Sequence, residues 1–403
     1  MSTLWMKKKK SLPLIESFLA GDDTTTDLVL LPYDIQGSVA HAKGLRKIGV
    51  LSAKEERALT RELGRIFTLW RAGKIKISPS EEDCHTVIEN LLVKRLGVVG
   101  KKIHTGRSRN DQVLTALRLY MKDAIAGVEK EIMFLMQAFE KKARAYKSIP
   151  MPGYTHTQRA MPSSVDAWLL SFRDALSDDL VFLASIKKII DQNPLGSVAG
   201  YGETTLGLDR ALTTKLLGFK QTQKNPLYCA LSRGKFELML LQALSAALFD
   251  IGKFATDALL FSTKEFGFLS LPDSFTTGSS VMPQKRNYDV LELMRGHAAA
   301  FNGTLVSLQS LIANLPAGYN RDFQLTKEPF MRGVKTAYQV ITVATLVVAN
   351  LTMDVSALKA ACTPELYATE EAYTLVKKQK IPFRDAYRNV AKNYEQGNRK
   401  TTS

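Results

Sequence analysis

The segment TGSSVMPQKRNYDVLELMRG, residues 277–296, holds side chains suited to acid–base chemistry beside a carboxylate. Gly278 permits backbone conformations that other residues avoid, and a pair of serines beginning at Ser279 then places hydroxyl groups in a loop. Lys285 and Asn287 follow as a cation and a neutral donor, groups that bind carboxylates. Removing a proton beside a carboxylate needs a base and a group that stabilises the developing charge. The segment therefore suggests proton abstraction, with a surface turn and helix cap as the alternative.

Four segments, in one order along the chain, carry a resemblance to a known family. The loop GSSVMPQKRN resembles the signature of the fumarase/aspartase superfamily. HTGRSRNDQV (residues 104–113), YTHTQRAMP (154–162) and GYNRDFQLTK (318–327) are similar to blocks of argininosuccinate lyases. The resemblance runs from about Leu4 to about Asn398 and so covers nearly the whole chain.

The resemblance implies an all-α protein with the three-domain fumarase/aspartase-like fold and a long central helix bundle. We expect an N-terminal helical domain (1–105), the bundle and oligomerisation domain (106–355) and a short, truncated C-terminal helical domain (356–403). It also implies a cytoplasmic homotetramer whose active sites combine loops of three subunits. The implied reaction is the reversible anti elimination of argininosuccinate to arginine and fumarate in arginine biosynthesis, without a metal or cofactor.

The same match implies roles for five catalytic residues. Ser279 is the expected base, which needs surrounding donors because a serine hydroxyl is a weak base in water. Lys285 and Asn287 would stabilise the dianionic intermediate. His156, with Glu292 as its carboxylate partner, would supply or relay a proton to the departing guanidine nitrogen. Taken alone, His156 is equally consistent with a loop histidine that holds backbone.

Further positions are implied to bind the substrate. The fumarate side is assigned to Ser108, Arg109, Asn110 and Thr155, the amino-acid side to Asp27, Tyr319, Gln324 and Lys327, and His85 is a further residue that lines the site. Arginine suits the first task because its planar guanidinium matches a carboxylate. Without the surrounding motifs, Arg109 would be read as a surface salt bridge and Tyr319 as a capping hydroxyl.

The chain also departs from the family pattern. Asp23 stands where many members carry a serine, Tyr288 replaces the usual proline after the signature asparagine, and LSRGK (231–235) replaces the more common SDRD form. LWMKKKK (4–10) replaces LWGGRF, and members commonly continue for tens of residues past the point where this chain ends, at Ser403. These departures leave every implied catalytic residue in place.

Apolar spacing predicts the elements that position these residues. Residues repeat at three- and four-residue intervals over 113–146, 162–190, 231–261, 290–312 and 328–351, and a further helix follows Asp83. Helices this long bury their apolar stripes by forming an elongated bundle. The glycine-rich stretch 193–207 is predicted to be a loop, and it lacks the ending of a phosphate-binding loop.

Composition excludes several other classes of protein. Three separated cysteines among 403 residues argue against a disulfide framework or zinc site, and 45% hydrophobic residues are normal for a globular chain. The basic run at 7–10 resembles the start of a leader, but Pro13 and Glu16 interrupt the apolar segment that follows. No uninterrupted apolar stretch is long enough to predict a membrane span.

Three other functions are compatible with parts of the sequence. The net charge of +16 is compatible with nucleic acid, but the basic residues are dispersed and no aromatic platform or reader motif accompanies them, which favours a solvated surface. Another lyase of the superfamily, such as adenylosuccinate lyase or fumarase, shares the serine loop. A non-catalytic scaffold comparable to the lens crystallins shares the fold. The block at 104–113 argues against another lyase of the superfamily, and the intact catalytic set argues against a non-catalytic scaffold.

Overall fold

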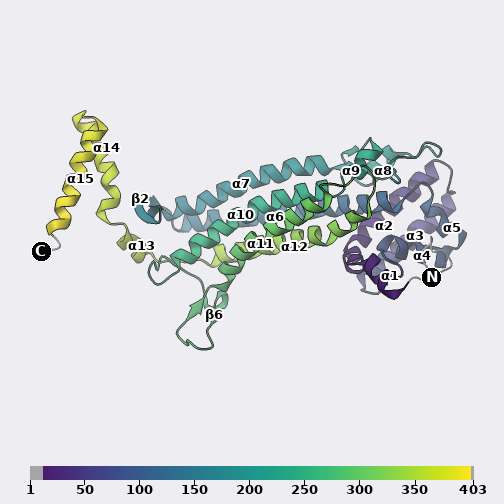
Figure 1. The fold of residues 1–403 in the computed structure, drawn as a ribbon, viewed down its shortest axis with the longest axis horizontal. Coiled ribbons are helices and arrows are strands. Elements are labelled where there is room, and N and C mark those ends of the chain that lie inside the picture. The colour runs from purple at the N-terminus through teal and green to yellow at the C-terminus, as the bar shows by residue number, and fades with distance from the viewer. Residues whose placement is uncertain (1–11, 401–403) are drawn as a thin grey trace. The chain divides into compact units, whose positions relative to one another are not determined.

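The protein is described from a computed structural model that covers residues 12–400 (Figure 1). The basic run at 7–10 and the departure at 4–10 lie outside these residues. Helices dominate the described chain, and the strands are short.

The elements follow in this order along the chain. The helices are α1 (Pro13–Ala20), α2 (Asp23–Lys47), α3 (Ala53–Arg71), α4 (Cys84–Leu96), α5 (Val98–Lys101), α6 (Arg109–Ala145), α7 (Val165–Ile190), α8 (Arg210–Leu216), α9 (Pro226–Leu231), α10 (Lys235–Phe261), α11 (Asp289–Ile312), α12 (Lys327–Asn350), α13 (Val355–Ala361), α14 (Ala368–Gln379) and α15 (Phe383–Lys400). The 3₁₀ helices are η1 (Lys102–His104), η2 (Asp273–Phe275), η3 (Arg321–Thr326) and η4 (Pro364–Tyr367). The strands are β1 (Pro150–Thr155), β2 (Gln158–Ser164), β3 (Gln192–Asn193), β4 (Gln221–Thr222), β5 (Leu269–Ser270), β6 (Thr277–Gly278), β7 (Arg286–Asn287) and β8 (Thr352–Met353).

The predicted all-α class is confirmed, and the five predicted long helices correspond to α6, α7, α10, α11 and α12. Two of them begin later than predicted. Residues 162–164 belong to β2, and α7 starts where the Ser164 hydroxyl accepts the backbone N–H of Ala167. Helix α10 starts at Lys235 because Gly234 has a φ of 76°, a left-handed conformation that ends the preceding turn.

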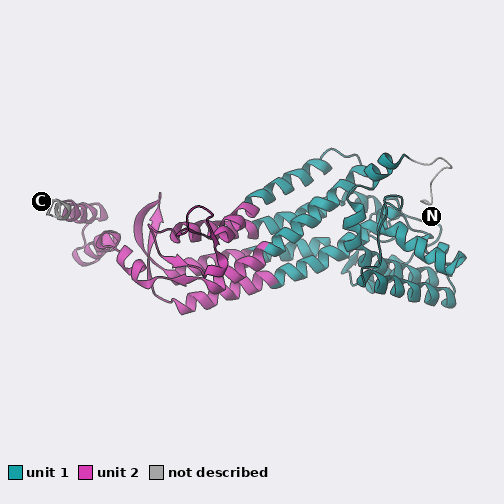
Figure 2. Cartoon of the chain, turned by 90° about the horizontal axis from the view of Figure 1, so that it is seen from below, with its two compact units in different colours: residues 1–130, 179–246, 299–339 teal, residues 131–178, 247–298, 340–403 magenta. Residues whose placement is uncertain are grey.

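The chain divides into two compact units (Figure 2). Unit 1 comprises residues 1–130, 179–246 and 299–339, and unit 2 comprises residues 131–178, 247–298 and 340–403. Each unit draws on separated stretches of sequence because the long helices contribute to both. The three contiguous domains expected from the resemblance stay a prediction.

In unit 1, helices α2, α3 and α4 enclose one apolar core. Leu45, Leu59, Leu63 and Leu92 are among its completely buried residues. Helix α3 begins with a capping box, in which Ser52 and Glu55 each accept the other's backbone N–H. The start of α4 is fixed in a similar way, since the Asp83 carboxylate accepts the backbone N–H of Thr86 at 2.8 Å. This cap holds His85 in the first turn of α4.

In unit 2, aromatic side chains of α6, α7 and α10 pack on one another. Phe139 and Trp168 both lie against Phe254, with ring centroids 5.1 and 5.7 Å away. The Trp168 indole donates a hydrogen bond to Asp257 at 3.0 Å, so its polar edge is satisfied. Strands β1 and β2 form an antiparallel hairpin, β5 pairs with β8, and β6 pairs with β7.

Among the described residues, helix α10 alone is long and apolar enough, by length and composition, to cross a membrane. More than half of its most apolar stretch is buried inside the protein, which is typical of a core helix. Asp250, Lys253 and Asp257 also interrupt its apolar surface.

Two glycine substitutions test how closely α4 packs on the segment that follows it. An added Cβ at Gly100 would lie 2.5 Å from the Leu92 carbonyl oxygen, whereas one at Gly64, inside α3, meets nothing within 4 Å. We expect Gly100→Ala to lower the free energy of unfolding by about 1–3 kcal/mol. Gly64→Ala should raise it by about 0.5–1 kcal/mol, because alanine is the better helix former. Urea denaturation of both variants measures this, and equal effects would contradict the close approach.

Candidate functional site

Unit 1 contains an open pocket with an empty volume of about 500 Å³. Six residues that the sequence assigns to substrate binding line it: His85, Arg109, Asn110, Tyr319, Gln324 and Lys327. Asp23, Glu82, Asp83, Val113, Arg233 and Arg321 also line it, and the sequence assigned no role to them. The segments around residues 23, 83, 109, 233 and 320 therefore meet at one place.

A buried lysine forms the floor of this pocket. Lys327 Nζ lies 2.6 Å from Asp23 Oδ2 and 2.7 Å from Asp27 Oδ1. Burial disfavours the ammonium, but the two carboxylates outweigh it and raise the pKa of Lys327. Asp27 is completely buried, and its other oxygen accepts the backbone N–H of Cys84 at 3.2 Å. Asp27 thus supports the pocket from behind rather than lining it.

The second cation of the pocket is Arg109, the first residue of α6. Its Nη1 lies 3.0 Å from Glu82 Oε2 and 2.5 Å from Asp83 Oδ2. Arg321 approaches the same Glu82 oxygen at 3.7 Å. Glu82 has a φ of 65°, an unfavourable conformation for a residue with a side chain. The pocket therefore presents a guanidinium that protein carboxylates already orient.

The loop before Arg109 is tied to the glycine-rich stretch by Asp111. One Asp111 oxygen accepts the backbone N–H of Ser108 at 2.9 Å, and the other accepts those of Gly196 and Val198 at 2.9 and 3.2 Å. Burial outweighs these donors and raises the pKa of Asp111 to about 6. Ser108 lies beside the pocket, where its hydroxyl accepts the N–H of Asn110. Sequence reasoning missed Asp111, although it stands inside the block at 104–113.

A buried histidine holds the other end of this loop. His41 Nε2 lies 2.9 Å from the carbonyl oxygen of Thr105. Burial, with the nearby charge of Arg107, lowers the pKa of His41 to about 3, so the neutral ring donates this hydrogen bond. Arg107 in turn donates to the Ser38 hydroxyl at 2.8 Å. Helix α2 thereby anchors the loop that carries residues 108–110.

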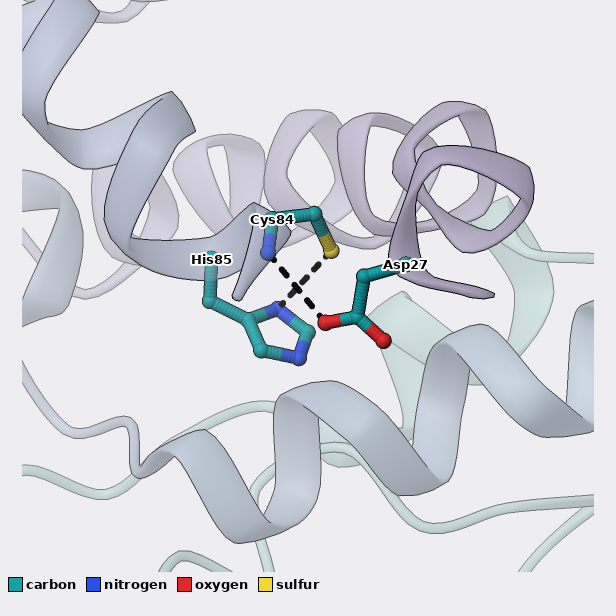
Figure 3. A group of neighbouring side chains, drawn as sticks. All are labelled: Asp27, Cys84 and His85. Atoms are coloured by element: carbon teal, nitrogen blue, oxygen red, sulfur yellow. Dashed lines mark hydrogen bonds between the residues drawn. The ribbon is translucent and has the colours of Figure 1, made fainter. Parts of the chain in front are cut away.

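Asp27, Cys84 and His85 form a group whose potential ligand atoms lie within 4.8 Å of one another (Figure 3). Two members already have a charged partner outside the group. Asp27 binds Lys327, and His85 Nδ1 lies 3.1 Å from Asp34 Oδ2. Burial opposes protonation of His85, but the surrounding carboxylates, Asp34 above all, outweigh it and raise the pKa of His85.

The cysteine of this group is equally unsuited to a metal. Burial and three nearby aspartates raise the pKa of Cys84 well above its ordinary value. A metal ligand must be a thiolate and a neutral imidazole. The chemistry of these three residues therefore fits an ion-pair network better than a metal centre.

Unit 2 contains the serine loop. Strands β6 and β7 pair Thr277 with Asn287, and the intervening loop turns back between them. The Ser279 hydroxyl oxygen accepts the backbone N–H groups of Val281 and Met282 at 3.3 and 3.0 Å. Two donors at one oxygen favour its deprotonated form. Lys285 is exposed in the same loop.

His156 occupies an unusual turn in unit 2. Thr155 pairs directly with Gln158, so only His156 and Thr157 connect strands β1 and β2. Their φ angles are 52° and 60°. Two-residue hairpin turns with two positive φ angles usually carry asparagine and glycine, so a histidine here is conformationally costly. Backbone strain of this kind concentrates at functional sites.

The predicted residues thus fall into two sets. Asp27, His85, Ser108, Arg109, Asn110, Tyr319, Gln324 and Lys327 belong to unit 1, and Thr155, His156, Ser279, Lys285, Asn287 and Glu292 belong to unit 2. Within the described part of unit 2, no ion pair joins His156 to Glu292, and both side chains are exposed. The catalytic roles implied by the resemblance therefore stay predictions.

Removing the ammonium of Lys327 leaves two buried carboxylates without their partner. Lys327→Met should lower the free energy of unfolding by about 3–5 kcal/mol. Arg332→Met, in the same helix, is the matched control. Arg332 pairs with Glu328 at the surface, and the loss of that pair should cost about 0–1 kcal/mol. Urea denaturation gives both values, and similar losses would argue against a stabilising role for the buried pair.

The depressed pKa of His41 predicts a dependence of stability on pH. The folded protein keeps His41 neutral, whereas the unfolded chain binds a proton below about pH 6.5, so the His41 contribution is lost as pH falls toward 3. Relative to His41→Gln, the wild type should lose about 1.4 kcal/mol per pH unit below pH 6. Unfolding measured at pH 4.5, 5.5 and 7.5 tests this, and a pH-independent difference would refute it.

The comparison of the sequence with known proteins supports the resemblance that the motifs carry. Residues 19–303 match the family described as Lyase. The chain is 43% identical to argininosuccinate lyase of Thermotoga neapolitana over 391 residues, covering 97% of this chain and 98% of that protein. It is also 43% identical to argininosuccinate lyase of Sorangium cellulosum, covering 96% and 90% of the two chains.

Solved structures support the fold. An EDDS lyase variant with bound fumarate matches with a TM-score of 0.81 at 24% identity, covering 97% of this chain and 78% of that one. Class II fumarase of Schistosoma mansoni matches with a TM-score of 0.76 at 15% identity, covering 93% and 91%. These similarities confirm the fumarase/aspartase-like fold. The relatives that are 43% identical over almost the full length of this chain show that it belongs to the argininosuccinate lyase family.

Proposed function

We propose that the protein is an argininosuccinate lyase, which converts argininosuccinate reversibly to arginine and fumarate in arginine biosynthesis. The observation that carries the proposal is the Ser279 loop. It holds a hydroxyl that accepts two backbone N–H groups, with Lys285 and Asn287 following in the same hairpin. The chain is 43% identical to argininosuccinate lyases over nearly its full length, which supports argininosuccinate as the substrate over the substrates of other lyases.

In the proposed reaction, the Ser279 oxygen removes the proton from the carbon beside a carboxylate of the succinate part. The electron pair left on this carbon delocalises into the carboxylate, where Lys285 and Asn287 stabilise the extra charge. The delocalised pair then forms the carbon–carbon double bond of fumarate as the carbon–nitrogen bond breaks, and the pair of the broken bond leaves with the guanidine nitrogen. His156, assisted by Glu292, supplies the proton that this nitrogen takes up. The scheme requires neither a metal nor a cofactor.

The unit 1 pocket suits the binding of the substrate's charged ends. Arg109 and Asn110 supply donors for the carboxylates of the fumarate side, with Ser108 beside them, and the resemblance assigns Thr155 to the same carboxylates. Tyr319, Gln324 and Lys327, supported by Asp27 and His85, receive the amino-acid end. A pocket that combines buried cations with buried carboxylates matches a substrate that is itself zwitterionic.

We further propose a homotetramer in which loops of different subunits complete each active site. Large apolar side chains remain exposed on the long helices, including Val181 in α7, Phe249 in α10, Val306 in α11 and Leu346 in α12. Exposed apolar side chains on several long helices support burial against other subunits. The exposure of His156 and Lys285 supports the same arrangement, because acid–base catalysis needs a site that excludes water.

Three free cysteines support a reducing, cytoplasmic location.

The proposal is tested by incubating the purified protein with argininosuccinate and following the ultraviolet absorbance of fumarate. Ser279→Ala should lower kcat by about 10²- to 10⁴-fold, the usual contribution of a positioned base. Ser280→Ala, at the exposed neighbouring hydroxyl, should retain activity.

Two results would overturn parts of the proposal. If Ser280→Ala lost activity and Ser279→Ala kept it, Ser279 would not be the base. If the wild type formed no fumarate while light scattering showed a tetramer, the chain would be an assembled scaffold without this activity.

A further inference from the structure

Asp23 is a pocket carboxylate that the proposed reaction does not yet use. It is the first residue of α2, and its side chain is about nine-tenths buried while still lining the pocket. Its Oδ2 lies 2.6 Å from Lys327 Nζ. Among the described residues, its Oδ1 has no hydrogen-bond partner. The Oδ1 atom of Asp23 is therefore available to accept a hydrogen bond.

The charges around Asp23 are not balanced by Lys327 alone. Asp23 and Asp27 share this single ammonium, and Asp27 also accepts the N–H of Cys84. Burial is the main reason that the pKa of Asp23 rises to about 6. The charge of Lys327 lowers this pKa, and that of Asp27 raises it further. A cation placed at the remaining oxygen would stabilise the ionised carboxylate.

The other cation near Asp23 is engaged elsewhere. The Arg233 guanidinium donates to the carbonyl oxygen of Phe323 and lies 5.4 Å from the Tyr319 ring centroid. It lowers the pKa of Asp23 through its charge, but no hydrogen bond joins the two side chains within the described residues. The carboxylate thus remains open to a cation from the pocket.

A second acceptor lines the same pocket. Gln324 Nε2 donates to the carbonyl oxygens of Leu19 and Ala20, at 2.8 and 3.0 Å. These bonds to the end of α1 occupy the donor side of the amide and leave its oxygen to accept. An ammonium group has three donors and no acceptor, so it matches a carboxylate beside an amide oxygen. A substrate carboxylate at this point would instead be repelled by Asp23.

We propose that Asp23 determines substrate specificity by binding the α-ammonium group at the amino-acid end of the substrate, with the Gln324 oxygen as a second acceptor. This inference rests on the proposed function and assigns one contact within it. A serine, which many family members carry here, offers only a neutral acceptor. A carboxylate forms a charge-assisted hydrogen bond that is roughly twice as strong. Asp23 therefore makes this chain more dependent on the ammonium group.

The test uses the reverse reaction, in which fumarate is consumed by a guanidine. Arginine is compared with 5-guanidinopentanoate, which has the same chain and carboxylate but no α-amino group. Asp23→Asn should lower kcat/KM for arginine by about 10- to 100-fold, because a hydrogen bond between charged groups is lost. It should leave kcat/KM for 5-guanidinopentanoate unchanged or higher. Asp23→Ser, which restores the residue of other members, should fall between the wild type and Asp23→Asn.

Asp22→Asn is the matched control, because Asp22 is the exposed neighbouring carboxylate and its side chain makes no capping hydrogen bond. It should leave the ratio of the two kcat/KM values unchanged. If Asp23→Asn also left the ratio of kcat/KM for arginine to kcat/KM for 5-guanidinopentanoate unchanged, Asp23 would not bind the ammonium group.

Calorimetry separates this inference from the proposed function. Arginine should bind the wild type about 10- to 100-fold more tightly than Asp23→Asn, whether or not fumarate is consumed. A wild type that binds arginine in this way without reacting would contradict the lyase and keep the inference. Equal affinity in the wild type and Asp23→Asn would overturn the inference alone.

Discussion

The arrangement of unit 1 depends on one buried ammonium, that of Lys327. It binds Asp23 and Asp27 at the start of α2. Asp27 also accepts the backbone N–H of Cys84, in the first turn of α4. Three elements far apart in sequence are thereby held around one charge. Taking charges out of water is costly, and the cost is recovered only when the partners are close and well oriented. The pocket is therefore built from groups that need one another to stay buried.

The irregular segments around the pocket are held by side chains, since loop backbone has few partners of its own. Asp111 and His41 fix the loop before Arg109. Arg210 does the same for the glycine-rich stretch, where its Nε and Nη2 donate to the carbonyl oxygens of Leu195 and Gln223 at 2.9 and 2.8 Å. Rigid loops at helix ends allow polar side chains to keep their directions while the pocket is open to water.

Periodicity predicted the long helices well because each buries a continuous apolar stripe. The β1–β2 hairpin was not predicted, since its strands contain Pro150, Pro152 and Pro162 and lack alternation. The family blocks identified six of the residues that line the pocket, and Asp27 behind it, but not the other partners. Nothing local in the sequence indicates that Asp23 meets Lys327, or that Glu82 and Asp83 orient Arg109. Such pairs form only when the fold joins distant segments, so propensity and spacing carry no signal for them.

The two-residue turn at His156 has a consequence for how this chain can vary. Thr155 and Gln158 pair directly, so the connection contains no spare residue. Inserting or deleting one residue would shift the pairing of β1 with β2 by one position, and every side chain beyond the shift would exchange faces of the hairpin. The pairing therefore tolerates substitutions in this segment better than changes in its length. Alignments of related chains should therefore show substitutions here but no gaps.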